Sequence, residues 1–230
     1  MRTAAVLPVK RFSAAKRRLG EGVDGRLRDA LVRAMVADVV GALAATPAIE
    51  LTIAVTGQRE LPEPGGPRLM VLEDTLEEGQ SAAASLGVSR ALELGFERVL
   101  CVPGDCPTLS PSELAALLSA PTAEGPEVAI VPDRHGSGTN GLLLAPPGVI
   151  APSFGPGSFE RHRSLVLGCG ANLRVERPPS LLLDIDTGED LQALRDRLAA
   201  GTGGAPRTRA LLAAGATPAP TPPAACAGGR

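Results

Sequence analysis

ERVLCVPGD, residues 97–105, is the stretch that decides the fold, because an almost continuous apolar run stops abruptly at Gly104 and Asp105. An unbroken apolar run predicts a strand that is covered on both faces, since a half-buried strand would alternate apolar and polar residues. Strands of this kind form parallel sheets with helices on either side. Polar residues that follow such a strand lie at the sheet edge where ligands bind.

Segments of the same apolar kind recur on both sides of residues 97–105 and alternate with segments of helical period. This alternation predicts an α/β fold of three layers, with a mainly parallel sheet between helices. Besides 97–105, the predicted strands are 4–9, 51–55, 68–74, 127–133, 140–146 and 172–178. The predicted helices are 25–45, 79–95, 110–120, 158–168 and about 189–199.

All of these elements fall within one expected domain, residues 1–200. From Gly201 the composition turns to Gly, Ala, Pro and Thr, and the segment ends in TPAPTPPAACAGGR. No apolar face of helical period is long enough there to form a core. We therefore expect residues 201–230 to be a disordered tail.

The composition argues against several classes of protein. Aromatic residues make up 2% of the chain, so it lacks the stacking platforms of a single-stranded nucleic-acid binder. The formal net charge is −2, and no apolar run reaches the roughly 20 residues that a membrane helix needs. The apolar stretch at the N-terminus is too short for a signal peptide, and four Cys without a CxxC pair favour a reducing compartment. We expect a cytoplasmic protein that binds neither nucleic acid nor a membrane.

Three carboxylates stand where apolar runs end. Asp105 closes residues 97–105, and Asp184 and Asp186 stand two residues apart, so an extended segment would place both on one face. Three carboxylates at one sheet edge repel each other unless a cation joins them, and oxygen ligands without His or Cys favour Mg²⁺. The alternative is that Asp105 caps a helix while Asp184 and Asp186 belong to a turn. The basic segment after the first predicted strand favours the metal site.

Two glycine-rich runs are candidates for anion binding. Residues 136–141, GSGTNG, either offer backbone N–H groups to an anion or form a plain hairpin turn. Residues 154–163, FGPGSFERHR, place Gly155 and Gly157 before Ser158, which is predicted to be the N-cap of a helix. The N–H groups that begin a helix suit a carboxylate or a phosphate.

Both lysines of the chain, Lys10 and Lys16, follow the first predicted strand in a polar, basic segment. A compact ammonium suits phosphate groups, with a solvated basic face as the alternative. Covalent nucleophiles are poorly provided for: Cys106 is interpreted as a packed residue, and His162 as a helix-surface residue or ligand contact without a catalytic role. Phosphoryl or nucleotidyl transfer fits, because it needs positioning and charge neutralisation more than a covalent residue.

Five stretches together resemble the 2-phospho-L-lactate / phosphoenolpyruvate guanylyltransferases of coenzyme F-420 biosynthesis. They are LPVKRFSAAKRRL (7–19), VPGDCPTLSP (102–111), RHGSGTNGLLL (134–144), FGPGSFERHR (154–163) and LLLDIDTGEDL (181–191). The resemblance covers about residues 4–199. That family is similar in fold to the GT-A-like, Rossmann-like nucleotidyltransferases, such as molybdenum-cofactor guanylyltransferase. Those commonly begin with an L-A-G-G-x-G-x-R loop, where this chain has Pro8-Val9-Lys10.

The resemblance implies transfer of GMP from GTP to a three-carbon phosphate acid, with release of diphosphate. It also implies a role for each candidate residue. Asp105, Asp184 and Asp186 would bind Mg²⁺. Lys10 and Lys16 would bind the nucleotide phosphates and, together with Asp105, would be catalytic. Thr139, Gly155 and Ser158 would bind the carboxylate or phosphate of the acceptor. Gln80 and Ser81 depart from the family's G-x-N-x-A stretch, which leaves the base contacts open.

The acceptor is less well defined. The family uses phosphoenolpyruvate, 2-phospho-L-lactate or, in some members, 3-phosphoglycerate, and the Arg-, Ala- and Pro-rich composition resembles members that use phosphoenolpyruvate. The alternatives are a nucleotidyltransferase for 3-phosphoglycerate or molybdopterin, a regulatory module on an inactive nucleotidyltransferase fold, and a nucleic-acid binder through residues 10–18. The carboxylates and lysines argue against the inactive module, and the missing aromatics against the nucleic-acid binder. A homo-oligomer and handover to the next pathway enzyme stay open.

Overall fold

The computed structural model describes residues 1–10, 19, 24–58, 61, 68–120, 124–201 and 204–215. Its centre is a seven-stranded sheet in the order β3-β2-β1-β4-β6-β5-β7. The strands are β1 (Thr3–Val9), β2 (Leu51–Thr56), β3 (Leu69–Glu73), β4 (Arg98–Cys101), β5 (Glu127–Pro132), β6 (Thr139–Ala145) and β7 (Asn172–Val175). Among the described strands, β6 is antiparallel to both of its neighbours and the other pairings are parallel, which confirms the predicted mainly parallel sheet.

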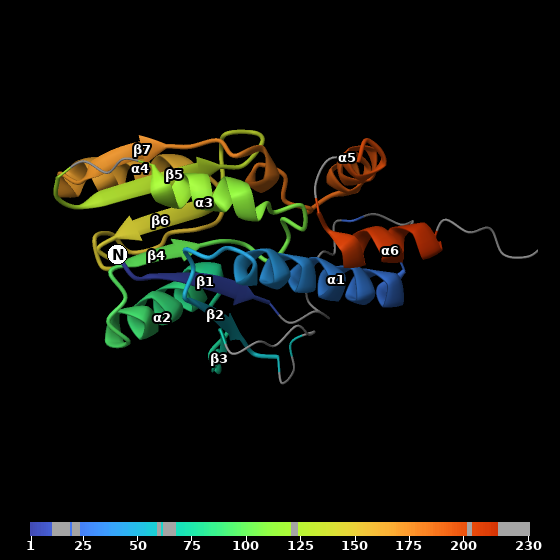
Figure 1. Cartoon of the computed structure of the whole chain (residues 1–230), viewed down its shortest axis with the longest axis horizontal. Helices are drawn as coiled ribbons and strands as arrows, with labels where there is room; N and C mark the ends of the chain where they lie inside the picture. The colour runs from blue at the N-terminus through green and yellow to red at the C-terminus, as the bar shows by residue number, and fades with distance from the viewer. Residues whose placement is uncertain are drawn as a thin grey trace, which may run out of the picture.

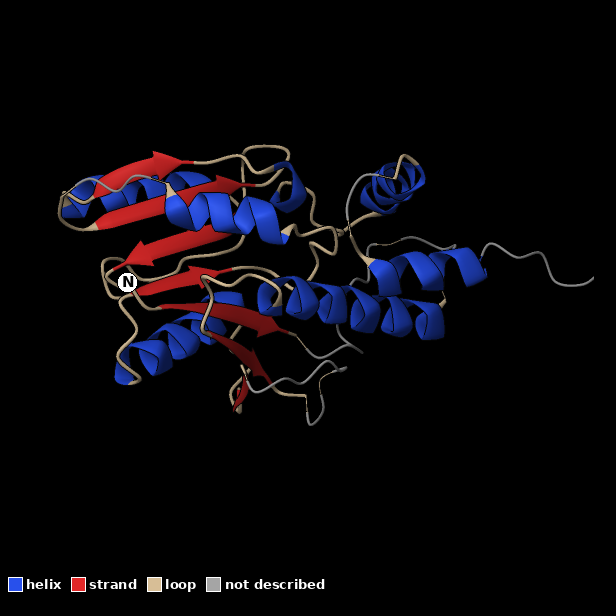
Figure 2. Ribbon diagram, viewed as in Figure 1, coloured by secondary structure: helices blue, strands red, loops and turns tan. Residues whose placement is uncertain are grey.

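Helices cover both faces of the sheet, and the predicted α/β fold of three layers is confirmed (Figures 1 and 2). One face packs against α1 (Gly25–Ala44), α3 (Pro111–Ser119) and α5 (Gly188–Ala199). The other packs against α2 (Gln80–Glu93) and α4 (Ser158–Cys169).

Successive residues of the central strand β1 face opposite layers. Leu7 belongs to the apolar cluster that contains α1 and α3, and Val6 to the cluster that contains α2, with both side chains fully buried. A strand between two apolar layers must be apolar at every position, which explains the unbroken apolar runs in the sequence. Gly87 lets α2 approach the sheet closely, because a Cβ there would lie 2.5 Å from a Cγ atom of Val6.

The direction of β6 decides which polar residues meet. Because β6 runs antiparallel to β4 and β5, its first residues, Thr139 and Asn140, lie at the edge where those two strands end. A chain segment that begins a strand therefore joins segments that end one. This is how Thr139 and Asn140 come to lie beside the loop that carries Asp105.

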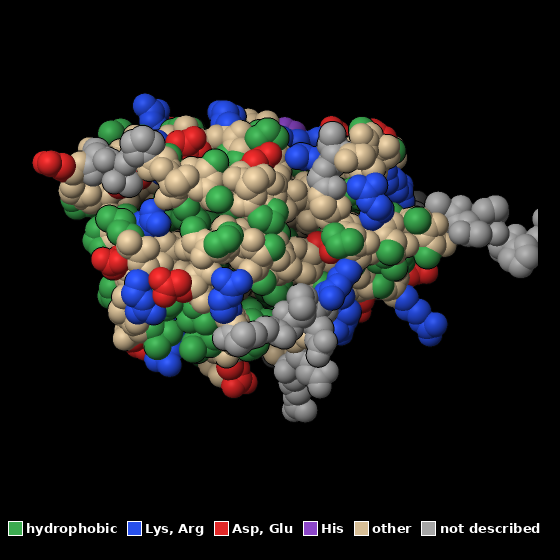
Figure 3. All heavy atoms as spheres, in the orientation of Figure 1, with side chains coloured by type: hydrophobic (Ala, Val, Ile, Leu, Met, Phe, Trp, Pro, Cys, Tyr) green, Lys and Arg blue, Asp and Glu red, His purple; other side chains and the backbone are tan. Residues whose placement is uncertain are grey.

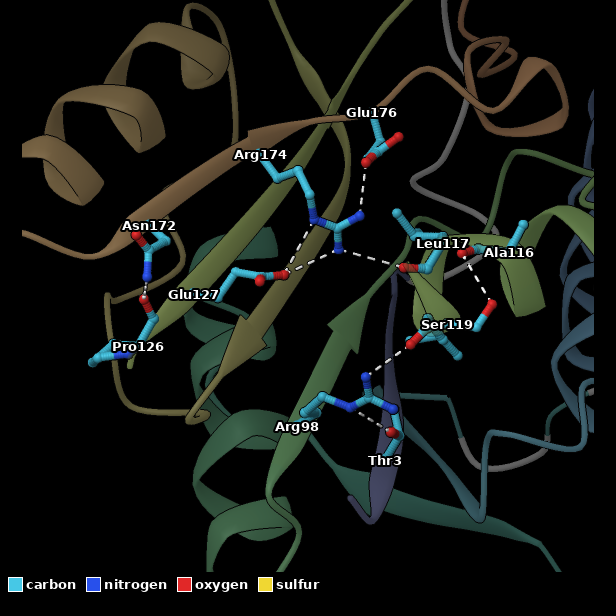
Figure 4. A network of polar contacts seen from close by, with 11 residues as sticks. Thr3, Arg98, Ala116, Leu117, Ser119, Pro126, Glu127, Asn172, Arg174 and Glu176 are labelled. Carbon is cyan, nitrogen blue, oxygen red and sulfur yellow. Dashed lines mark hydrogen bonds and ion pairs between the residues drawn. The ribbon is translucent and has the colours of Figure 1, made fainter. Parts of the chain in front are cut away.

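A buried ion pair ties the edge strand β7 to the rest of the sheet. The guanidinium of Arg174 pairs with Glu127 of β5 at 3.1 Å and with Glu176 at 2.7 Å (Figure 4). It also donates to the carbonyl of Leu117 near the end of α3. The Glu127 side chain is 5% exposed, so these contacts offset the cost of burying its charge.

The surface carries charges of both signs. On the face seen in Figure 3, Lys and Arg side chains are interspersed with Asp and Glu side chains. Within the part of the chain that the structure describes, no helix has the length and apolar character needed to span a membrane.

The predicted disordered tail is wrong for residues 206–215, which form α6 (Pro206–Gly215) packed along α1 (Figure 1). The carboxylate of Asp38 on α1 accepts the N–H groups of Arg207 and Thr208 at 3.1 and 2.8 Å. Groups in the first turn of a helix have no partner within the helix itself, so Asp38 caps α6 from another element. The folded unit therefore extends past the predicted boundary at residue 200. The remaining predicted tail, residues 216–230, lies outside the described residues.

Candidate active site

A cavity of about 760 Å³ lies at the carboxyl edge of the sheet, where the sequence predicts the chemistry. Its walls come from the segments after β1, β4 and β5, from the start of β6, and from the loops before α4 and α5. The candidate site residues that line it are Lys10, Asp105, Thr139, Gly155, Ser158, Asp184 and Asp186. Lys16 lies outside the described residues. The structure thus brings seven candidates to one cavity, while the role of each stays a prediction.

Asp105 and the segment 183–186 are joined through the backbone. The N–H of Ile185 donates to the carbonyl of Asp105 at 3.1 Å. The Ile185 side chain is fully buried in the core, so Asp184 and Asp186 on either side of it face the cavity. Residues 183–186 form a loop and not a strand, yet the two carboxylates share one face as the i, i+2 spacing predicts.

The electrostatics of Asp184 show how closely these carboxylates lie. Burial, and after it the charge of Asp105, raise the pKa of Asp184 to about 6. Asn140 acts in the opposite direction, because its amide donates to Asp184 Oδ1 at 3.1 Å and favours the ionised form. Asp186 adds a smaller repulsion.

This set of donors fits a divalent cation. Partly buried carboxylates that repel one another are stabilised when a cation lies between them, and oxygen donors are those that Mg²⁺ prefers. Among the described residues, no group of three or more His, Cys, Asp or Glu side chains is arranged closely enough to hold a metal ion. The assignment of Mg²⁺ to Asp105, Asp184 and Asp186 therefore stays a prediction.

Asp190, which the sequence analysis did not single out, holds the backbone of this segment. Its Oδ2 accepts the N–H groups of Asp186 and Thr187 at 3.1 and 2.8 Å, and its Oδ1 pairs with Arg134 at 2.7 Å. Burial acts to raise the pKa of Asp190, but the hydrogen bonds from Thr187 and Asp186 and the charge of Arg134 outweigh it and hold the pKa below its usual range. The available signal was the Thr187-x-x-Asp190 spacing of a capping box, which α5 forms.

The three acceptor candidates, Thr139, Gly155 and Ser158, also line the cavity. Thr139 and Ser158 are 7% and 1% exposed, and Gly155 has a φ of +106°, which favours glycine. The predicted N-cap role of Ser158 is wrong, because Gly157 takes that position in the left-handed conformation and Ser158 is the first residue of α4. The N–H of Ser158 donates to the carbonyl of Gly155 at 3.0 Å.

The glycine-rich run 136–141 forms the hairpin turn that joins β5 to β6, which was the plainer of its two interpretations. Asp133 satisfies two N–H groups of this turn: its carbonyl accepts from Gly136 at 3.1 Å and its carboxylate from Ser137 at 2.9 Å. The N–H groups of Gly136 and Ser137 are therefore already partnered beside a carboxylate and do not offer an anion a binding site. The residues of the run that line the cavity are Ser137, Gly138, Thr139 and Asn140.

His162 does not lie on a helix surface as expected, because its side chain is fully buried. Its Nδ1 lies 3.0 Å from the hydroxyl of Thr139, and its Nε2 accepts the N–H of Ser153 at 2.8 Å. Burial, and after it the neighbouring charge of Arg161, lower the pKa of His162 to about 4. His162 is therefore a neutral imidazole at physiological pH.

The loop before α4 is also held from the α2 side of the cavity. The N–H of Phe154 donates to the hydroxyl of Ser81, in the first turn of α2, at 2.8 Å. Ser81 is one of the two positions at which the sequence departs from the family's stretch near the nucleotide. The hydrogen bond gives Ser81 a structural role between the two sides of the cavity.

Lys10 and Cys106, which the sequence also singled out, lie in different environments. Lys10 is exposed where β1 ends, at the rim of the cavity. Cys106 is fully buried, with its Sγ facing the carbonyl of Leu181, which agrees with its interpretation as a packed residue. An inward thiol of this kind is not placed to attack a substrate.

Solved structures of nucleotidyltransferases share this fold. The chain resembles a nucleotidyl transferase from Methanothermobacter with a TM-score of 0.59 and 21% identity, over 87% of this chain and 99% of that one. It resembles 4-diphosphocytidyl-2C-methyl-D-erythritol synthase from Anaerococcus prevotii with a TM-score of 0.56 and 12% identity, over 86% and 96% of the two chains. At these identities the likeness establishes the fold alone.

Closer sequence relatives define the family. The chain belongs to the family of CofC-like guanylyl transferases, whose model matches residues 3–199. It is 44% identical to a phosphoenolpyruvate guanylyltransferase of Conexibacter woesei, over 92% of this chain and 96% of the relative. It is 39% identical to one of Rubrobacter xylanophilus, over 84% and 94%. The resemblance predicted from the five motifs is confirmed, and the chain is a nucleotidyltransferase.

Proposed function

We propose that this enzyme transfers GMP from GTP to phosphoenolpyruvate and releases diphosphate, as a step of coenzyme F-420 biosynthesis in the cytoplasm. The observation that carries the proposal is the meeting of two kinds of group in one cavity. The carboxylates Asp105, Asp184 and Asp186 line the same cavity as Thr139 and Ser158. Relatives named phosphoenolpyruvate guanylyltransferase, at up to 44% identity, support this acceptor over 3-phosphoglycerate or molybdopterin.

The reaction is an in-line displacement at the α-phosphorus of GTP. An oxygen of the acceptor's phosphate forms the new P–O bond, the bond between the α-phosphorus and the bridging oxygen breaks, and diphosphate departs with the electron pair. The acceptor phosphate is ionised at neutral pH, so no general base has to remove a proton. What the protein must supply is positioning and the neutralisation of charge as two anions meet.

Three groups of residues would contribute to this reaction. Asp105, Asp184 and Asp186 would hold Mg²⁺, which when bound neutralises the phosphate oxygens. Lys10, exposed at the rim, is placed to bind the nucleotide phosphates, and we assign Lys16 the same role from the sequence. Thr139, Gly155 and Ser158 would bind the acceptor and orient its phosphate towards GTP.

The test is diphosphate release by the full-length chain with Mg²⁺, in a matrix of nucleotides and acids. GTP, CTP and ATP are each combined with phosphoenolpyruvate, 2-phospho-L-lactate and 3-phosphoglycerate, and the product is identified by mass. We expect the highest kcat/KM for GTP with phosphoenolpyruvate. A preference for CTP or ATP, or no diphosphate release with any of the three acids, would contradict the proposal.

A further inference from the structure

We propose that His162 is a positioning residue for the acceptor: its neutral imidazole, protonated at Nδ1, fixes the Thr139 hydroxyl so that the hydroxyl donates its hydrogen to the acceptor anion. The inference rests on the proposed function, because it takes the cavity wall formed by Thr139, Gly155 and Ser158 to bind the acceptor. It adds a residue that does not touch the acceptor and acts on it through Thr139.

The hydrogen bonds fix the tautomer of His162. The backbone N–H of Ser153 can only donate, and it lies 2.8 Å from Nε2, so Nε2 must be the unprotonated acceptor nitrogen. A neutral imidazole with a bare Nε2 carries its proton on Nδ1. Nδ1 lies 3.0 Å from Thr139 Oγ1, and the Nδ1–H therefore donates to the hydroxyl. The ring of Phe154, edge-on at 5.2 Å and 74°, packs beside the imidazole.

The direction of the Thr139 hydroxyl follows from this. A hydroxyl that accepts from His162 must give its own hydrogen to another group. Within the described part of the chain, His162 is the hydrogen-bond partner found for this hydroxyl, and Thr139 lines the cavity. Its hydrogen is thus available to a carboxylate or phosphate oxygen there. If the tautomer were reversed, the hydroxyl would have to donate to Nδ1 and would offer the acceptor only lone pairs.

The neighbouring Arg161 acts on the same loop from its outer side. Its guanidinium donates to the carbonyls of Ser153 and Phe154 at 3.0 and 3.1 Å, and to that of Pro156. Arg161 lines a second cavity, of about 740 Å³, on the outer side of α4. In a trans peptide the C=O and N–H point in opposite directions, so the N–H of Gly155 is turned away from Arg161. Arg161 and His162 thus hold the loop 153–157 from two sides with its glycine N–H turned from the outer surface.

The test uses two substitutions that each keep half of the imidazole's bonds. In His162→Asn the amide nitrogen replaces Nδ1 and keeps the donor to Thr139; in His162→Gln the amide oxygen replaces Nε2 and keeps the acceptor for Ser153. Thr139→Val, the double variant Thr139→Val with His162→Gln, and Arg163→Gln on the exposed side of α4 complete the set. Binding of phosphoenolpyruvate is measured by calorimetry, and KM for the acid and for GTP by diphosphate release. The ¹⁵N shifts of His162 are recorded at pH 7.

We expect His162→Gln to weaken phosphoenolpyruvate binding about tenfold or more, the scale of a lost hydrogen bond to an anion, with the KM for GTP little changed. His162→Asn should retain most of the binding, and Arg163→Gln all of it. In the Thr139→Val background, His162→Gln should weaken phosphoenolpyruvate binding no further, because Thr139→Val has already removed the hydroxyl that His162 orients. The ¹⁵N shifts should show a neutral ring protonated at Nδ1.

Several outcomes would overturn the inference alone: additive losses in the double variant, wild-type binding by His162→Gln, or a ring protonated at Nε2. Failure of the wild-type enzyme to bind phosphoenolpyruvate would overturn the proposed function and the acceptor role with it. The ¹⁵N measurement separates the two cases, because it reports the tautomer without any ligand.

Discussion

The carboxylate of Asp190 accepts the backbone N–H of Asp186 at 3.1 Å, and so links the first turn of α5 to a candidate metal ligand. We predict that Asp190→Asn, which removes the charge that pairs with Arg134, raises the Mg²⁺ concentration needed for half-maximal activity about tenfold or more. The reason is that Asp186 loses part of its fixed position. Magnesium titrations of the reaction measure this effect.

The matched control for this substitution is Glu189→Gln. Glu189 also pairs with Arg134, at 3.2 Å, but its side chain is 82% exposed. We expect its Mg²⁺ dependence to equal that of the wild-type enzyme. Identical dependence in Asp190→Asn would show that the capping box of α5 serves stability alone.

The candidate ligands themselves give a second prediction. Asp184→Asn and Asp186→Asn each remove one formal charge at nearly constant shape, so activity should fall by about two orders of magnitude or more with the fold intact. Turnover and circular dichroism of each variant measure this, and Asp196→Asn on the exposed side of α5 serves as the control. Near-wild-type turnover of Asp186→Asn would remove Asp186 from the ligand set.

A third prediction concerns α6. Deletion of residues 204–230 should lower Tm by several degrees, because it removes the packing of the buried Ala205 and Thr208 against α1 and the two hydrogen bonds that Asp38 accepts. Deletion of residues 216–230 alone should leave Tm unchanged, since that segment has no core-forming pattern. Thermal unfolding of both truncated chains tests this prediction. Equal Tm values for the two truncated chains would mean that α6 contributes nothing to stability.

α6 also shows where sequence reasoning fails. The continuous apolar runs of β1, β4 and β5 predict the sheet, and Ser110 predicts the start of α3, because these signals lie inside the elements they form. The signal for α6 lies outside that helix, because the residue that caps it, Asp38, is about 170 residues away in the sequence. A segment rich in Gly, Ala and Pro folds there because α1 supplies both an apolar surface and a capping carboxylate.

The candidate site also contains residues that the sequence predicts and residues that it does not. The carboxylates and the glycine-rich loop follow strand ends and are visible as motifs, so the sequence brings them to one edge. The residues that hold them in place, such as His162 and Asp190, act through partners on other elements or on the backbone. A lone His in FERHR does not indicate that Thr139 lies 3.0 Å from it, because that contact exists only after α4 packs on the sheet.

A fourth prediction follows from the pKa of His162, which is lowered from 6.5 to about 4 in the folded protein. Between these pH values the unfolded chain binds a proton at this residue and the folded chain does not, so the free energy of unfolding falls as the pH falls. The contribution of His162 is about 3 kcal/mol, fully present above pH 6.5 and lost on approach to pH 4.

Urea denaturation of the wild-type protein and of His162→Gln between pH 4 and 7.5 tests this, because the difference between the two curves isolates His162 from the carboxylates. That difference should shrink as the pH falls. His135→Gln is the control, since His135 is exposed and is the other His of the chain. A difference that stays constant with pH would mean that His162 is protonated in the folded state too.

The last prediction concerns the cations that follow β1. Lys10 is exposed at the cavity rim, where a mobile ammonium can bind the triphosphate and follow the departing diphosphate. Lys10→Ala should therefore lower the rate with GTP about a hundredfold while calorimetry shows little change in phosphoenolpyruvate binding. Lys16→Arg should be milder than Lys16→Ala, because it keeps the charge and changes only its shape. If both alanine variants turn over GTP normally, the segment after β1 is a solvated basic surface, and the charge that develops on the diphosphate must be neutralised by other groups of the cavity.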